Sequence, residues 1–199
     1  MKWPVMVSRW SAVRQRYANT DDSGQANRQE PGFARPGRVR DPSLHGILWM
    51  DMTWVTGRIA VGGGIWNAEN MAAVARAGVT HIIDMQIEFD DTALAAPYGI
   101  EVLWNAVDDD FQPKPPEVFR RGVEFALAAL DEPGTKLYIH CAAGVHRAPM
   151  MALAVLCSLS WSLPQALQLI EARRPVVDFA DVYVQSVERF VQEYVAARK

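Results

Sequence analysis

From residue 47 onward, short apolar segments alternate with longer helical patterns, and this alternation restricts the folds that the chain can adopt. Helical segments of ten or more residues separate most of the apolar segments, which favours crossover connections between parallel strands. We therefore predict an α/β fold with a mainly parallel central sheet flanked by helices. Active sites in such sheets lie beyond the carboxyl ends of the strands, so functional residues are sought there.

Local signals place the individual elements. Asn67 is a candidate N-cap and Gly78 a stop signal for the helix between them. Pro164 and Pro175 break the helical C-terminal part. The expected strands are residues 79–85, 100–107 and 136–140, preceded by a hairpin at 47–55 and 58–63, while residues 108–115 form an acidic loop and 116–130 a helix.

The composition describes one soluble domain. The chain has 199 residues, 50% of them hydrophobic, which is enough for one substantial core. Its longest apolar run, residues 148–159, contains Cys157 and Ser158 and is shorter than the roughly 20 residues of a membrane span. The apolar stretch near the N-terminus is too short for a secretory signal. We expect a cytoplasmic protein with no membrane partner and make no prediction of its oligomeric state.

Charge and composition set the N-terminal part apart. Residues 1–46 carry a net charge of +4, whereas residues 47–199 carry −7. The first segment is rich in Gly, Pro and polar residues, so we predict a flexible basic extension, with a short helix over residues 6–17. A basic arm for an acidic partner is the alternative interpretation. The acidic remainder argues against nucleic acid, whose phosphates require a positive surface.

The segment KLYIHCAAGVHRAPMMALAVL combines a strand, a turn and a helix with a cysteine and an arginine in the turn. A turn that enters a helix presents free backbone N–H groups, which bind anions. Gly144 lets the backbone bend inward, and Arg147 can bind two phosphate oxygens at once. The same groups favour a thiolate, so Cys141 is expected to be ionised near neutral pH. The pattern predicts a phosphate cradle with a nucleophile at its floor.

The second cysteine serves as a control for this interpretation. Cys157 lies in a uniformly helical segment and is followed six positions later by a leucine rather than an arginine. A packed core thiol is therefore the better interpretation of Cys157, and the alternative for Cys141. A thiol redox enzyme is disfavoured, because Cys157 lies too far along the helix to form a bridge with Cys141.

The sequence HCAAGVHRAP resembles the signature loop of the cysteine-based protein tyrosine phosphatases, His-Cys-x5-Arg, and the size of the domain is similar to the dual-specificity branch. The resemblance extends from about Trp54 to the C-terminus. It implies a phosphatase-like catalytic domain at residues 47–199, a three-layer architecture, nucleophilic attack by Cys141, and no metal or other cofactor. The implied phosphate loop consists of Ala142, Ala143, Gly144, Val145, His146 and Arg147.

Phosphatases of this family use an aspartate from a separate loop as general acid, and the chemistry itself requires one to protonate the leaving group. The acidic loop offers Asp108, Asp109 and Asp110. Asp109 lies ten residues before Phe119, the spacing that the resemblance to related loops implies for the catalytic acid, so it is the first choice and Asp108 the second. The alternative is that all three only solvate the loop and that one caps the helix.

Three positions around the loop need separate interpretation. Ala148 occupies the place where the family usually has Ser or Thr, whose hydroxyl helps to release the intermediate, so turnover is expected to be slow. His146 could add positive charge at the rim below about pH 6.5, or could be a solvent-facing residue without a role. His140 corresponds to the family histidine that orients the loop, and a buried strand histidine is the competing interpretation.

The resemblance implies a phosphomonoester hydrolase that acts through a phosphocysteine on a phosphorylated protein, with phosphotyrosine as first choice and phosphoserine or phosphothreonine as second. Lipid phosphatases tend to carry lysines where Ala142 and Val145 stand, and a glucan phosphatase of this fold is a further alternative. A phosphate-binding module with little turnover is the competing class. We expect the tryptophans Trp54, Trp66 and Trp104 in the core, and Arg173 and Arg174 as a charged helix end that complements the helix dipole.

Overall fold

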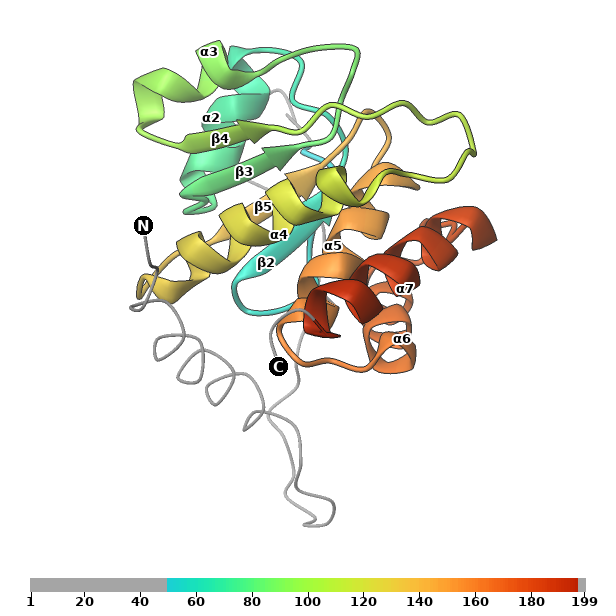
Figure 1. Cartoon of the computed structure of the whole chain (residues 1–199). Helices are drawn as coiled ribbons and strands as arrows, with labels where there is room; N and C mark the ends of the chain where they lie inside the picture. The colour runs from blue at the N-terminus through green and yellow to red at the C-terminus, as the bar shows by residue number, and fades with distance from the viewer. Residues whose placement is uncertain (1–49, 197–199) are drawn as a thin grey trace, which may run out of the picture.

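The computed structural model describes residues 50–196, whose centre is a five-stranded sheet in the order β1-β2-β5-β3-β4 (Figure 1). β1 and β2 pair in antiparallel fashion as a hairpin, and the other three pairings are parallel. The predicted mainly parallel sheet is therefore confirmed. The strands are β1 (Met52–Trp54), β2 (Ile59–Gly62), β3 (His81–Asp84), β4 (Glu101–Trp104) and β5 (Leu137–His140).

Successive residues of the strands face two different cores. Ile83 and Ile139 pack into the core on one face, whereas Ile82 and Tyr138 pack into the core on the other. This follows from the two-residue period of a strand and makes three layers. The helices are α2 (Ala68–Arg76), α3 (Thr92–Ala95) with a 3₁₀ turn η1 (Ala96–Tyr98), α4 (Pro116–Asp131), α5 (Arg147–Ser158), α6 (Leu163–Arg173) and α7 (Asp181–Ala196).

The helix ends follow the expected chemistry. Asn67 caps α2 by accepting a hydrogen bond from the backbone N–H of Asn70 at 2.8 Å. Gly78 follows this helix with φ +81°, a conformation that glycine adopts without strain. Proline occupies the first turn of α4, where no backbone donor is lost. At α6, Ser162 and Gln165 form a capping box, so Pro164 lies in the first turn of a helix rather than in a break.

Helix α5 lies in the middle of the larger core, and every residue from Arg147 to Cys157 is buried. It contacts β5 below it and α4, α6 and α7 around it. This buried position explains the apolar run of the segment. Within residues 50–196, no helix is both long and apolar enough to cross one. Cys157 is a packed core thiol as predicted, and burial raises the pKa of Cys157 to about 11.

The prediction for the tryptophans is wrong at two of three positions. Trp66 is 48% exposed and Trp104 is 46% exposed, whereas Trp54 is partly buried against the smaller core. Trp104 ends β4, which is an edge strand, and its indole N–H donates to the carbonyl of Gln86 at 2.7 Å. Local apolarity did not reveal that this strand lies at the edge of the sheet. The predicted extension at residues 1–46, with its helix, lies outside the described residues.

Candidate active site

The turn between β5 and α5 places Cys141 at the carboxyl end of the central strand, where the site was predicted. Cys141 is 1% exposed, and the backbone N–H of Gly144 donates to its Sγ at 3.3 Å. Gly144 has φ +65°, and a Cβ at this position would lie 2.4 Å from the backbone carbon of Gly62. Only glycine fits here, and the backbone folds back over the sulfur as a result.

The carbonyls of this loop are turned away from the sulfur by groups outside it. The Nε–H of Arg174 donates to the carbonyl of Gly144 at 2.9 Å, and the backbone N–H of Asp178 donates to that of Val145 at 3.1 Å. Since successive peptide groups with their carbonyls on one side present N–H groups on the other, the arrangement suits an anion above the loop.

Arg174 stands at the end of α6 as predicted, but its guanidinium supports the phosphate loop, so the prediction that its charge serves the helix dipole is wrong. It is 3% exposed, and its two terminal nitrogens donate to the two carboxylate oxygens of Asp51 at 2.8 and 2.6 Å. The Asp51 carboxylate compensates the charge of the buried Arg174 guanidinium, and the carbonyl of Gly144 accepts a hydrogen bond from its Nε–H. Arg173, in contrast, is exposed in the last turn of α6, as expected.

Arg147 begins α5 and is held by Glu88, a residue that the sequence analysis missed. The two terminal nitrogens donate to the carboxylate of Glu88 at 2.9 and 2.7 Å, and one of them also donates to the carbonyl of Val107 at 3.1 Å. The hydrogen bond from Arg147 holds the pKa of Glu88 below its ordinary value. The only sequence signal for Glu88 is an acidic residue shortly after β3, at the carboxyl edge of the sheet.

The Nε of this guanidinium lies on the side of the acidic loop. The Nε–H of Arg147 is buried and has no hydrogen-bond partner among residues 50–196, and Asp109 Oδ2 lies 3.7 Å away. A buried donor without a partner is costly, and an oxyanion over the loop would accept from it. Arg147 thus presents one edge to Glu88 and another to the site.

Only one of the three candidate acids in the acidic loop faces this site. Asp109 lies 3.0 Å from His146 Nδ1 and accepts a hydrogen bond from the hydroxyl of Tyr183 at 3.0 Å. Asp108 is exposed and accepts the backbone N–H of Asp109. Asp110 pairs with Lys114, whose hydrogen bond lowers the pKa of Asp110. The geometry favours Asp109 as a proton donor, and its catalytic role stays a prediction.

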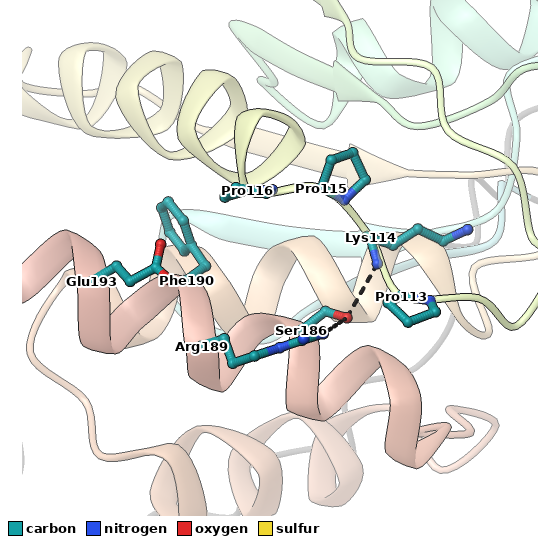
Figure 2. A pocket seen from close by; sticks show the side chains of 8 residues that line it. All are labelled: Pro113, Lys114, Pro115, Pro116, Ser186, Arg189, Phe190 and Glu193. Atoms are coloured by element: carbon teal, nitrogen blue, oxygen red, sulfur yellow. Dashed lines mark hydrogen bonds between the residues drawn. The ribbon is translucent and has the colours of Figure 1, made fainter.

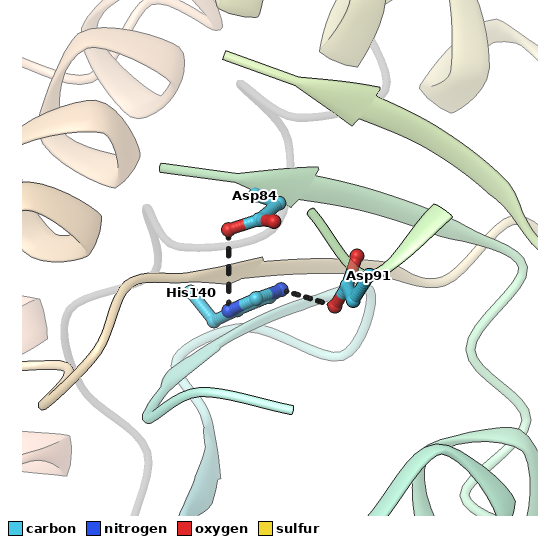
Figure 3. Close-up of side chains that lie close together, drawn as sticks. All are labelled: Asp84, Asp91 and His140. Carbon is cyan, nitrogen blue, oxygen red and sulfur yellow. Dashed lines mark ion pairs between the residues drawn. The ribbon is translucent and has the colours of Figure 1, made fainter. Parts of the chain in front are cut away.

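His140 lies immediately beneath the loop, in a fully buried cluster with two aspartates (Figure 3). Its Nε2 is 3.0 Å from Asp91 and its Nδ1 is 3.8 Å from Asp84. Burial is the main reason that the pKa of Asp84 is raised to about 7. Nearby polar atoms of these three residues lie within 4.8 Å of one another. The two carboxyl groups face opposite nitrogens of the His140 imidazole, however, whereas a metal ion would bind only one of these nitrogens. The arrangement therefore suits hydrogen bonds between the imidazole and the two carboxyl groups better than a metal site.

A pocket of about 310 Å³ lies beside the far end of the acidic loop rather than at Cys141 (Figure 2). The pocket lies between the prolines at the start of α4 and one side of α7. At its edge, the backbone N–H of Lys114 donates to Ser186 Oγ at 3.1 Å. The acidic loop is thus attached to α7 where it turns into α4. The lining residues are Pro113, Lys114, Pro115, Pro116, Ser186, Arg189, Phe190 and Glu193.

The three-layer fold, with a cysteine-to-arginine loop at the carboxyl end of its central strand, defines the class of cysteine-based protein tyrosine phosphatases. Comparison with known families narrows this class, because residues 65–192 match the dual specificity phosphatase catalytic domain. The chain belongs to this family.

Curated relatives include three Slingshot phosphatases. The chain is 31% identical over 118 residues to protein phosphatase Slingshot homolog 3 of Mus musculus and 33% identical over 116 residues to the Homo sapiens protein, matches that cover 58% and 57% of this chain. The Drosophila melanogaster protein phosphatase Slingshot is 26% identical over 129 residues, or 64% of this chain. The matches span 17%, 17% and 12% of the respective relatives, which are therefore much longer proteins.

Solved structures agree on the fold. The chain superposes on PTPMT1 in complex with PI(5)P with a TM-score of 0.67 at 20% identity, covering 75% of this chain and 99% of that one. Human DUSP28 gives a TM-score of 0.61 at 21% identity, with coverages of 73% and 95%. The predicted dual-specificity phosphatase-like architecture is therefore confirmed.

Proposed function

We propose that the protein is a phosphomonoester hydrolase that acts through a phosphocysteine on phosphorylated proteins. The observation that carries this proposal is the buried Arg147 Nε–H, which has no hydrogen-bond partner among the described residues and lies 3.7 Å from the Asp109 carboxylate. A phosphoryl group there would meet a nucleophile, a planar cation and an acid together.

The steps follow from these positions. The thiolate of Cys141 attacks phosphorus, so that a sulfur–phosphorus bond forms while the ester bond breaks, and Asp109 gives its proton to the departing oxygen. A water molecule then attacks the phosphocysteine, its proton passes to the Asp109 carboxylate, and phosphate and thiolate are released. Arg147 and the loop N–H groups stabilise the charge on the equatorial oxygens in both steps.

The surroundings of the loop favour a substrate with a single phosphate. Exposed carboxylates lie on the loops next to the site, at Glu88, Asp108, Asp110 and Asp178. These carboxylates would repel a second phosphate, and the uncharged side chains of Ala142 and Val145 would not attract one. We therefore propose a phosphoprotein, with phosphotyrosine first, ahead of a multiply phosphorylated lipid or glucan.

The first test is hydrolysis of an aryl phosphate by the purified protein in the presence of a chelator, beside Cys141→Ser and Arg147→Lys. We expect activity in the wild type, none in Cys141→Ser, and a large loss in Arg147→Lys because lysine cannot present two parallel donors. Activity that survives in Cys141→Ser would overturn the thiol mechanism. Phosphopeptides and phosphoinositide vesicles, compared by kcat/KM, then test the substrate class.

A phosphate-binding module with little turnover is the second candidate, because Ala148 supplies no hydroxyl beside the sulfur. Ala148 is fully buried in the first turn of α5. If the wild-type protein and Cys141→Ser are both inert but bind tungstate, a phosphate analogue, this second candidate replaces the first. If turnover is present but slow, a rapid burst of released phenol should precede the steady state.

A further inference from the structure

Asp109 is held in place from two sides, by the phosphate loop and by the last helix. His146 belongs to the phosphate loop and lies 3.0 Å from Asp109 Oδ2, while Tyr183 on α7 donates to Oδ1 at 3.0 Å. We infer that His146 and Tyr183 are positioning residues that hold Asp109 as the general acid, an inference that rests on the proposed function. The phosphate loop then does more than bind the phosphoryl group, because it also places the acid that protonates the leaving group.

Tyr183 can serve this purpose because its hydroxyl makes two hydrogen bonds to the acidic loop. The hydroxyl accepts the backbone N–H of Phe111 at 2.9 Å and donates to Asp109. Burial raises the pKa of Tyr183 to about 12, so the hydroxyl keeps its proton throughout the range in which an enzyme would be assayed. Ser186, one turn further along α7, holds the far end of the same loop through Lys114 (Figure 2). Helix α7 thus fixes the loop at two points.

The loop backbone is held in a strained conformation by these contacts. Phe111 has φ +55°, which costs a non-glycine residue about 1 kcal/mol or more and persists only where the surroundings impose it. Its ring stacks on Tyr183 with centroids 5.8 Å apart and meets the edge of His146 at 5.0 Å. The strain and the two ring contacts indicate that the acidic loop is built to adopt this position beside the phosphate loop.

His146 can hold Asp109 in both of its protonation states. Its Nδ1 faces Asp109, and its Nε2 lies 3.6 Å from Asp178. With its proton on Nδ1, His146 can donate a hydrogen bond to Asp109 Oδ2, since this oxygen keeps a lone pair for accepting whether or not Asp109 is protonated. The acid proton then stays available for the leaving oxygen. The charged groups facing His146 are Asp109 and Asp178, with Arg147 adjacent in the chain.

The dependence of the rate on the leaving group separates positioning of an acid from a merely structural role. Phenyl phosphate needs protonation of its leaving oxygen, whereas 2,4-dinitrophenyl phosphate releases a stable phenolate without it. We expect His146→Leu and Tyr183→Phe to lower kcat/KM, which reports the step that expels the leaving group, by about 10- to 100-fold for phenyl phosphate and by less than about threefold for the dinitrophenyl ester. Asp109→Asn should show the same pattern with a larger loss.

Three further variants complete this experiment. His146→Asn keeps a short polar group near the position of Nδ1 and should restore part of the phenyl phosphate rate. The matched controls are His81→Asn and Tyr98→Phe, on β3 and in η1, which should leave both rates unchanged. Binding of tungstate by each variant confirms that its phosphate loop is intact.

The possible outcomes distinguish the two proposals. If the wild-type protein is inert, or if Cys141→Ser is active, the proposed function fails. If turnover depends on Cys141 and Asp109→Asn is selective for phenyl phosphate, but His146→Leu and Tyr183→Phe slow both esters equally or neither, the positioning inference fails alone. Selective loss in both variants, with recovery in His146→Asn, supports it.

Discussion

Two histidines at the two ends of the phosphate loop have the same kind of partners in opposite surroundings. His140 precedes the cysteine and lies between Asp84 and Asp91, and all three are fully buried. His146 precedes the arginine and lies between Asp109 and Asp178, where all three side chains are partly exposed. Because the residue types are the same, we expect burial to decide the difference: the buried histidine should stabilise the fold, whereas the exposed one has the role that we propose in positioning Asp109.

The buried cluster should contribute far more to stability than the exposed one. His140→Leu leaves two buried carboxyl groups without the imidazole that faces both of them, and we expect the free energy of unfolding to fall by about 3–5 kcal/mol. His146→Leu should lower it by no more than about 1 kcal/mol, because its pairs face water. Urea unfolding of the two variants measures both values. Equal losses would show that the two clusters play the same structural role.

The pH dependence of stability should show that Asp84 is the residue of the buried cluster whose ionisation opposes folding. Its folded-state pKa is raised from 3.8 to about 7, so its contribution is fully present below pH 3.8 and is lost as the pH rises through 7. Asp84→Asn removes this dependence. We expect the stability of the variant relative to wild type to be greater at pH 8 than at pH 5 by roughly 2 kcal/mol or more.

Asp178→Asn is the matched control for that experiment, since Asp178 is exposed beside the other histidine. Its stability relative to wild type should change by less than about 1 kcal/mol between pH 5 and pH 8, because an exposed pair with His146 contributes little. A pH-independent difference for Asp84→Asn would mean that the buried carboxylate is ionised throughout and is compensated by His140.

Double-mutant cycles compare the two clusters by the coupling energy of one histidine–aspartate pair in each. We expect the coupling between His146 and Asp178 to stay below about 1 kcal/mol, as for other exposed ion pairs. The corresponding cycle with His140 and Asp91 should give a larger coupling, because no water screens the pair. Unfolding of the single and double variants, with leucine for histidine and asparagine for aspartate, measures both couplings.

Added salt should have the smallest effect on the free energy of unfolding, and it should act only on the exposed cluster around His146. Raising the ionic strength from about 0.05 to 0.5 M screens exposed charges, so the stability difference between wild type and His146→Leu should shrink by a few tenths of a kcal/mol. The difference between wild type and His140→Leu should not change. Equal sensitivity in both would indicate that water reaches the buried cluster.

The sequence was most informative where the relevant residues are close together along the chain. The strand, the glycine, Cys141 and Arg147 lie within a dozen residues, so their local pattern predicts the loop and its place at the end of a strand. The sheet and the α2 cap were predictable for the same reason, because periodicity and capping are local properties.

The remaining features depend on contacts between distant segments. Arg174 was misread because its partner Asp51 lies 123 residues earlier, and Glu88 was missed because it lies 59 residues before Arg147. The role of His146 stayed open because its neighbours belong to two separate loops. Trp104 was placed in the core because apolar neighbours do not show which strand forms the edge, and Trp66 because they do not show that it lies in the connection between β2 and α2.

The contact between Arg174 and Asp51 also sets the smallest piece of chain that can form the phosphate loop. The family match covers residues 65–192, which contain Cys141 and Arg147 but neither Asp51 nor the β1–β2 hairpin. A fragment cut at residue 65 would leave the Arg174 guanidinium buried without its carboxylate, and Gly144 without the backbone of Gly62 against which it packs. We therefore expect completion of the loop to be a late event in folding, since it requires the residue before β1 and the end of α6 to meet from distant parts of the chain.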